Sequence, residues 1–351
     1  MQNYESLIKS KSSPVFLISR TDSIGDVVLT LPMAGVLKSL YPDSKIIFLG
    51  KTYTKPIVDC CSYVDEFLNW DTIKFQDESK QINIVKEKNI DVFIHVFPNK
   101  QIAKLAKKAK IPFRIATSHR TYNWLYCNKL VNLSRKKSAL HESQLNIKLI
   151  KCLGANLFYE VNKLNNFIGI KAKDIPTQAD SLIDKNRFNL ILHPKSNSSA
   201  REWGVENFNN LISLLPQEDY NIFISGTKQE GDFIRESVIN KNKEKVHDLT
   251  GLFSLEEFIS IINKSDRLIA ASTGPLHIAS ALGIKALGIY PPIRPMHPGR
   301  WKPIGQRTKV FCKEEECSKC RKTKDCLCMK SISPKEVVDY LDSIKIKKTA
   351  N

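Results

Sequence analysis

An alternation of short apolar runs with amphipathic segments extends along the whole chain and constrains its fold more than any other feature. In the first half, apolar runs cover residues 15–19, 45–50 and 91–97, and helical patterns cover residues 26–40 and 101–109. Buried parallel strands read as near-continuous apolar runs, and a helix usually links one parallel strand to the next. We therefore predict α/β organisation around an open parallel sheet.

The same alternation resumes in the second half after a polar interruption. Residues 155–186 lack the pattern and contain Pro176 among scattered lysines and aspartates, so we place the connection between two domains there. A length of 351 residues also suits two domains better than one core. Beyond the connection, strand patterns cover residues 188–194, 220–226, 267–272 and 285–290.

The predicted fold is two Rossmann-like, doubly wound domains that face a central cleft. We expect the first domain over residues 1–165 and the second over residues 166–332. Residues 333–351 are expected to form a C-terminal helix that can pack back on the first domain. In such folds, ligands bind outside the carboxyl ends of the parallel strands. Motifs at strand ends are therefore the candidates for function.

The charge balance is strongly basic, with 54 lysines and arginines against 36 aspartates and glutamates and a formal charge of +18. This favours a polyanionic partner, such as nucleic acid, an anionic membrane or a phosphorylated glycolipid, although a generally basic proteome would also produce it. Residues 1–20 show no apolar core of signal-peptide length. The most apolar stretch, residues 268–293, contains Pro275 and Lys285, which is untypical of a bilayer helix. We predict a cytoplasmic protein.

The first candidate motif is ISRTDSIGDVVLTLP, at residues 18–32. A predicted strand ends there, Gly25 allows a tight turn or a close approach to a ligand, and Asp26 opens a helix. A carboxylate at that edge of the sheet can take a proton from an acceptor hydroxyl. The alternative is that Asp26 only stabilises the start of the helix, by about 1 kcal/mol.

The second motif is LHPKSNSSAREWGVENF, at residues 192–208. Small polar side chains follow a predicted strand, and the backbone N–H groups of such a loop can form an anion pocket. Arg201 can bind a phosphate with its planar fork of donors. The alternative is a polar turn with a surface arginine. The candidate residues are Ser196, Asn197, Ser199 and Arg201.

The third motif is AASTGPLHIASALGIKALGIYPP, at residues 270–292. Thr273 and Gly274 stand at a predicted helix start, where unpaired N–H groups and the helix dipole favour a phosphate. His277 lies on the same first turn and can point at the same anion. A structural histidine whose hydrogen bonds are satisfied within the protein is the alternative.

Together the three motifs resemble those of the ADP-heptose:lipopolysaccharide heptosyltransferases, glycosyltransferase family nine. The shared pattern is an S-I-G-D start, an H-P-x-S loop followed by S-A-R-x-W, and a later T-G-P-x-H-x-A-x-A-L-G. The motifs occur in the family's order and spacing, and the resemblance covers most of the chain. It implies a GT-B fold and inverting transfer of heptose from ADP-heptose to the lipopolysaccharide inner core.

By position, the resemblance implies that Asp26 is the catalytic base and that Arg201 contacts the donor diphosphate. One residue departs from the family, because Ser272 stands where many members have aspartate. This departure favours an alternative, a transferase of the same fold that uses another nucleotide sugar or a surface-glycan acceptor. The nucleotide contacts implied by the resemblance are Thr273, Gly274 and His277.

No D-x-D occurs in the sequence, although many transferases hold the diphosphate through a divalent ion with such a pair. We therefore expect no catalytic metal and no cofactor, because Arg201 and the helix start can supply the positive potential. Near the C-terminus, four cysteines have spacings compatible with a structural zinc site, and reduced thiols are the preferred interpretation. They are Cys317, Cys320, Cys326 and Cys328.

A lysine-rich segment at residues 101–114 and a second basic segment at residues 119–124 belong to the predicted acceptor-side domain. Lys104, Lys107 and Arg120 can face a phosphorylated glycolipid at the cytoplasmic leaflet of the inner membrane, which predicts a peripheral membrane association. A solvated helix face is the alternative.

Two other classes of protein fit the sequence less well. A basic nucleic-acid-binding α/β protein would account for the charge, but no RRM, KH or zinc-finger pattern is present, so we expect no nucleic-acid partner. A dehydrogenase would account for the strand–helix alternation, but it needs a glycine fingerprint, and no G-x-G occurs.

Overall fold

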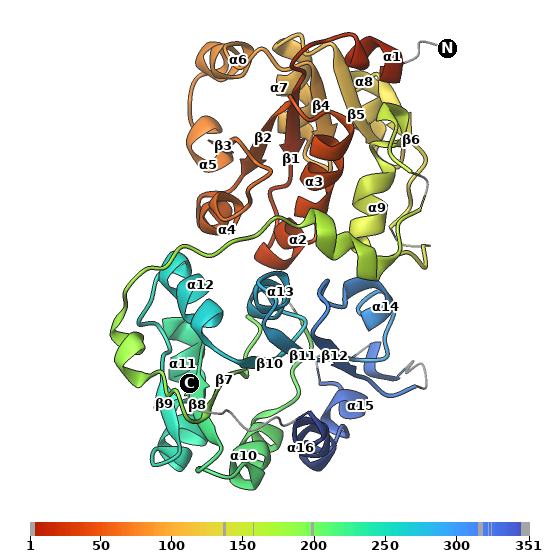
Figure 1. The fold of residues 1–351 in the computed structure, drawn as a ribbon. Coiled ribbons are helices and arrows are strands. Elements are labelled where there is room, and N and C mark those ends of the chain that lie inside the picture. Colours follow the sequence, from red (N-terminus) through yellow and green to blue (C-terminus); the bar gives the residue numbers. More distant parts are fainter. Residues whose placement is uncertain are drawn as a thin grey trace. The chain divides into compact units, whose positions relative to one another are not determined.

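The computed structural model describes residues 4–135, 138–156, 158–197, 200–314, 319–321, 323 and 325–344. The chain divides into two compact units, Met1–Lys171 and Ala172–Asn351, each with its own sheet (Figure 1). The division falls inside the polar connection predicted over residues 155–186, a few residues beyond the expected boundary at residue 165.

The first unit is built on six parallel strands in the order β3-β2-β1-β4-β5-β6. Central β1 (Val15–Ser19) is almost entirely buried, as its apolar sequence predicts. The strand order reverses between β1 and β4, and doubly wound sheets bind ligands at such a reversal. The other strands are β2 (Lys45–Gly50), β3 (Glu66–Asn69), β4 (Val92–His95), β5 (Phe113–Thr117) and β6 (Lys129–Val131).

Helices connect these strands, and the helix expected over residues 26–40 is divided in two. α2 (Ile24–Val28) ends before Leu29, and α3 (Leu31–Leu40) begins after Thr30. Pro32 lies in the first turn of α3, where its missing N–H costs nothing, but it cannot continue a preceding helix. The other helices are α1 (Tyr4–Lys9), α4 (Lys55–Asp59), α5 (Trp70–Ile73), α6 (Glu78–Lys86), α7 (Lys100–Lys108), α8 (Thr121–Tyr126) and α9 (Glu142–Lys148).

The second unit repeats this topology, with six parallel strands in the order β12-β11-β10-β7-β8-β9. β7 (Phe188–His193) and β10 (Arg267–Ala271) are neighbours at the reversal point, as β1 and β4 are in the first unit. The predicted pair of doubly wound parallel sheets is therefore confirmed. The other strands are β8 (Tyr220–Ile224), β9 (Val246–Asp248), β11 (Lys285–Ile289) and β12 (Thr308–Phe311).

The helices of the second unit include the expected C-terminal helix, α16 (Pro334–Ser343). This helix contacts α10 (Val205–Leu214) of the second unit, and its expected packing on the first domain stays a prediction. Val337 and Leu341 of α16 are buried in the core cluster of that unit, which also contains Trp203. The other helices are α11 (Lys228–Ile234), α12 (Leu255–Lys264), α13 (Gly274–Ala281), α14 (Pro298–Trp301) and α15 (Leu327–Lys330).

Candidate active site

Asp26 lies at the carboxyl edge of the first sheet, where the chain leaves β1 and enters α2. Ser23 is the N-cap residue of α2, and Gly25 and Asp26 complete its first turn. One carboxylate oxygen of Asp26 accepts a hydrogen bond from Arg20, and the other accepts from the Ser23 hydroxyl. Through Ser23 the carboxylate supports the helix start. The side chain of Asp26 is still 18% exposed, so it has both a structural contact and access to solvent.

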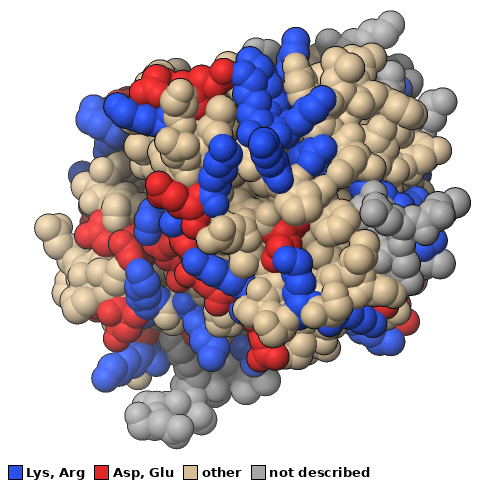
Figure 2. Space-filling model, turned by 90° about the horizontal axis from the view of Figure 1, so that it is seen from above, with Lys and Arg blue, Asp and Glu red and all other residues tan. Residues whose placement is uncertain are grey.

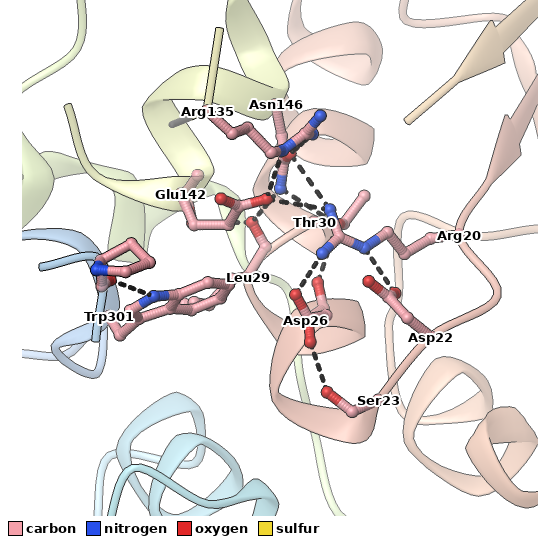
Figure 3. Close-up of polar contacts among 12 residues, drawn as sticks. Arg20, Asp22, Ser23, Asp26, Leu29, Thr30, Arg135, Glu142, Asn146 and Trp301 are labelled. Atoms are coloured by element: carbon pink, nitrogen blue, oxygen red, sulfur yellow. Dashed lines mark hydrogen bonds and ion pairs between the residues drawn. The ribbon is translucent and has the colours of Figure 1, made fainter. Parts of the chain in front are cut away.

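Arg20 is the buried centre of a polar cluster around Asp26 (Figure 3). Its guanidinium donates from Nε to Asp22 Oδ1 at 2.6 Å, from Nη1 to Glu142 Oε1 at 3.0 Å and from Nη2 to Asp26. Burial disfavours the charged guanidinium, but Asp26, Asp22 and Glu142 outweigh burial, and the pKa of Arg20 lies above its ordinary value. A permanently charged arginine therefore faces three carboxylates.

Asp22 is the second carboxylate of this cluster that solvent can reach. Burial and repulsion from Asp26 raise its pKa to about 6, although Arg20 acts in the opposite direction. Tyr53 donates its phenol hydrogen to the backbone carbonyl of Asp22, and burial raises the pKa of this phenol to about 12. The cluster therefore contains two carboxylates with partial access to water, Asp22 and Asp26, on either side of one guanidinium.

Sequence reasoning identified Asp26 and Gly25 but missed Arg20, Asp22 and Glu142. Arg20 and Asp22 stand inside the first motif, ISRTDSIGD, so their position beside the predicted base could have been noticed. Glu142 offered no comparable signal, because it lies 122 residues from Arg20 and only the fold brings the two together.

In the second unit, the second and third motifs lie at the same sheet edge. β7 pairs with β10 in parallel register, with Ala270 opposite His193, so the loops that follow these strands are neighbours. His193 is buried, and its Nδ1 lies 3.0 Å from Ser225 Oγ. Burial lowers the pKa of His193, although the attraction of Glu230 acts in the opposite direction. The lowered pKa favours a neutral imidazole.

Ser196 and Arg201, two candidate donor-binding residues in the loop after β7, lie in different environments. The backbone N–H and hydroxyl of Ser196 both bond to Glu202 Oε1 at 3.1 Å, so a carboxylate occupies these donors. Arg201 is partly exposed, and its Nε is buried without a hydrogen-bond partner among the described residues. Asn197 adopts a positive φ of 44°, and Ser199 lies outside the described residues.

The loop after β10 leads directly into α13. Thr273 is the N-cap residue, its hydroxyl bonds to Ala271 O at 3.3 Å, and its side chain makes no cap bond. Gly274 is the first helical residue and, like Ser272, is partly exposed. His277 is buried on the same first helical turns. The first N–H groups of α13 are thus directed toward the carboxyl edge of the sheet, as an anion site requires.

The candidate acceptor residues lie on and beside α7 and α8. Lys104 pairs with Glu78 at 3.3 Å, and Lys107 donates to the carbonyl of Leu125 at 2.8 Å. Arg120 is exposed at the N-cap position of α8. Trp124 on α8 is 66% exposed. Figure 2 shows the first unit from above, with lysine and arginine side chains gathered on part of this face.

The cysteine cluster is only partly described. Cys317 lies outside the described residues. Cys320 Sγ is 3.9 Å from Cys328 Sγ, and Cys326 is buried nearby in the chain. Within the described part of the chain, no group of three or more His, Cys, Asp or Glu side chains could hold a metal ion. None of the described helices is both long and apolar enough to cross a bilayer.

Two doubly wound parallel sheets of this topology form the GT-B architecture of glycosyltransferases. Within that class, residues 82–330 match the model of glycosyltransferase family 9 (heptosyltransferase). The chain belongs to this family, so it is a glycosyltransferase enzyme, and the resemblance seen in the three motifs is confirmed.

Individual relatives agree with this assignment. A Haemophilus influenzae protein with the provisional name of glycosyltransferase is 27% identical over 84% of this chain and 88% of its own length. The lipopolysaccharide core heptosyltransferase OpsX of the same organism is 21% identical over 86% of this chain and 85% of its own. The structure of Escherichia coli ADP-heptose lps heptosyltransferase II has a TM-score of 0.73, with 16% identity, over 94% of this chain and 98% of that one.

Proposed function

We propose that this protein transfers a heptose from ADP-heptose to the inner core of lipopolysaccharide, with inversion at the anomeric carbon and Asp26 as general base. The observation that carries the proposal is the position of Asp26, a partly exposed carboxylate at the reversal point of the first sheet. The names of the relatives, which include a lipopolysaccharide core heptosyltransferase and an ADP-heptose heptosyltransferase, support this choice of donor and acceptor.

Inversion requires the acceptor oxygen to attack the anomeric carbon from the face opposite the leaving ADP. A new carbon–oxygen bond forms, the bond from the anomeric carbon to the phosphate oxygen breaks, and the acceptor proton passes to Asp26. A carboxylate within hydrogen-bond reach makes the hydroxyl a better nucleophile as the proton leaves. Each oxygen of Asp26 has a second lone pair beyond its bond to Arg20 or Ser23, so the carboxylate can still accept.

The donor diphosphate is assigned to the carboxyl edge of the second sheet. Arg201 Nε is a buried donor without a partner among the described residues, and the backbone N–H of Gly274 lies at the start of α13, where it has no partner within the helix. These groups would stabilise the negative charge that develops on the leaving ADP. With no D-x-D in the sequence, they supply that charge stabilisation without a divalent cation.

We predict that Arg201→Ala weakens ADP binding by about 1.5 to 3 kcal/mol, the value of a hydrogen bond to a charged group. This corresponds to roughly a 10- to 150-fold higher dissociation constant at 25 °C. Isothermal titration of purified variants with ADP measures the effect directly.

Lys241→Ala is the matched control, because it removes a positive charge from an exposed position of the same unit. It should bind ADP within about twofold of the parent, since exposed charges contribute little at a distance. A folded Arg201→Ala variant with the affinity of the parent would show that the donor diphosphate binds elsewhere.

The same fold also supports a second candidate, transfer from a different nucleotide sugar. The specific observation is Ser272, a partly exposed neutral residue before Thr273 and Gly274. Comparing turnover of ADP-heptose with turnover of other ADP- and UDP-linked sugars distinguishes the two. Preference for a donor other than ADP-heptose would favour this second function.

The acceptor is assigned to the basic surface of α7 and α8, defined by Lys104, Lys107 and Arg120. Exposed Trp124 lies on α8, and an amphipathic aromatic ring suits a membrane interface. We propose that this surface holds the protein at the cytoplasmic leaflet of the inner membrane.

The triple variant Lys104→Gln, Lys107→Gln and Arg120→Gln should bind anionic vesicles at least about tenfold more weakly, since each basic residue near such a surface contributes about 1 kcal/mol. Co-sedimentation with phosphatidylglycerol-containing vesicles measures this, and binding should fall with salt. Vesicle binding equal to that of the parent would mean that another surface meets the membrane.

A further inference from the structure

We propose that Glu142 is a positioning residue for the reaction, acting on Asp26 through Arg20. The proposal rests on the proposed role of Asp26 as general base and adds to it the group that sets the geometry and charge around that base. Glu142 itself has no exposed surface, so it cannot touch a substrate.

The first observation is the way in which Arg20 is shared. A guanidinium is a rigid planar fork, and each of its three nitrogens here serves a different carboxylate. Asp22 and Asp26 belong to the chain segment that carries Arg20, whereas Glu142 lies on α9, far along the sequence (Figure 3). Among these three carboxylates, Glu142 is the one that connects the guanidinium to a separate element of the fold, and Asn146 Oδ1 of the same helix also accepts from Arg20 Nη1 at 3.4 Å.

The second observation is that side chains of α9 form hydrogen bonds to the backbone at the end of α2. The Ser143 hydroxyl donates to the backbone carbonyl of Leu29 at 2.6 Å, and Asn146 Nδ2 donates to the same carbonyl at 3.2 Å. Asn146 also donates to the Thr30 hydroxyl at 3.1 Å. Glu142 is thus held at a fixed place relative to the helix that carries Asp26.

The third observation is the local charge balance. Three carboxylates, of Asp22, Asp26 and Glu142, face Arg20, and Arg135 Nε bonds to Glu142 Oε1 at 2.9 Å behind it. By partly neutralising Arg20, Glu142 keeps that cation from stabilising the Asp26 carboxylate so strongly that it becomes a poor base. The pKa of Asp22 is raised by burial and by repulsion from Asp26, against the effect of Arg20, which is consistent with a cluster rich in negative charge.

The charged and titratable groups around Asp26 determine the direction of the expected pH effect. Arg20, Asp22 and Glu142 lie around it, Arg135 lies behind Glu142, and the Tyr53 phenol bonds to the backbone beside Asp22. Removing the negative charge of Glu142 makes this environment more positive. Arg20 then stabilises the ionised carboxylate of Asp26 more strongly, which makes it a weaker base.

The test is Glu142→Gln in the full-length enzyme. We expect kcat to fall at least about tenfold, because the base is displaced and weakened. The acidic limb of the kcat profile should move to lower pH. ADP affinity should not change, because the donor site belongs to the second unit. Glu160→Gln is the matched control, since it removes the same charge from an exposed pair with Lys163.

A second variant should move the acidic limb of the kcat profile in the opposite direction. Arg135→Gln removes a positive charge from the far side of Glu142, so the acidic limb should move to higher pH. Arg135 is partly exposed, so this variant decides the matter if Glu142→Gln does not fold. An acidic limb that stays in place in every folded variant overturns the proposal.

The failure of this inference can be told apart from the failure of the proposed function. If Asp26→Asn loses activity while Glu142→Gln and Arg135→Gln leave kcat and the acidic limb unchanged, Asp26 is the base and Glu142 is only structural. If Asp26→Asn stays active, the proposed base is wrong and the inference fails with it.

Discussion

Asp26→Asn is expected to give a folded enzyme that binds ADP like the parent but loses at least about 10²-fold in kcat. Asparagine has nearly the size of aspartate and keeps an oxygen for the Ser23 hydroxyl or for Arg20, but it cannot accept the proton of the acceptor hydroxyl. A positioned general base typically contributes about 10²- to 10⁴-fold in rate. Steady-state kinetics at saturating donor and acceptor measure the loss in kcat.

Asp43→Asn is the matched control, because Asp43 is exposed in the same unit. Its kcat should stay within about twofold of the parent, as expected for a surface substitution. Near-parental activity of a folded Asp26→Asn variant would leave Asp26 with only its structural contact to Ser23. Circular dichroism and ADP titration establish that the compared variants are folded.

Arg20→Met is expected to lower the free energy of unfolding by about 3 to 5 kcal/mol at pH 7. Methionine replaces the aliphatic part of the arginine side chain but leaves three carboxylates without their central cation, and removing one partner of a buried ionic cluster typically has this effect. Denaturant unfolding followed by circular dichroism measures the loss.

The loss of folding stability in Arg20→Met should depend on pH in a defined direction. Arg20 lowers the pKa of Asp22 against burial, so losing Arg20 raises that pKa in the folded state. The stability that Asp22 contributes is then present at low pH and is lost as pH rises. The variant should therefore be closest to the parent near pH 4 and weakest near pH 7. Lys163→Met, which breaks an exposed pair with Glu160, should change stability by less than about 1 kcal/mol. A similarly small change for Arg20→Met would contradict the central role of this arginine.

Most interior strands of the two sheets could be predicted from the sequence, whereas interior β5 and the edge strands could not. β1, β2, β4, β7, β8, β10 and β11 are apolar runs because neighbours cover both of their faces. By contrast β6, at the edge of the first sheet, is three residues long and partly exposed throughout, and β9 has one buried residue in three. Such short segments leave no periodic pattern that a sequence could reveal.

The site shows a similar division between local and distant information. Asp26, Thr273 and Gly274 could be located because a strand, a glycine turn and a helix start follow one another in the chain. The contact between Arg20 and Glu142 could not, because it depends on the packing of α9 against the end of α2. The hydrogen bond from Ser196 to Glu202 also could not be predicted, because either residue could have faced a ligand instead.

The sharing of one guanidinium among three carboxylates also constrains how this corner of the molecule can change over evolutionary time. A lysine at position 20 has a single nitrogen and could not hold Asp22, Asp26 and Glu142 in three directions at once. An isolated loss of Arg20 would leave three carboxylates without their central cation, and an isolated loss of Glu142 would leave Arg20 Nη1 and Arg135 without that partner. These four positions should therefore be inherited as a set. Lineages that lack the acidic residue at position 142 should also have abandoned the arginine at position 20.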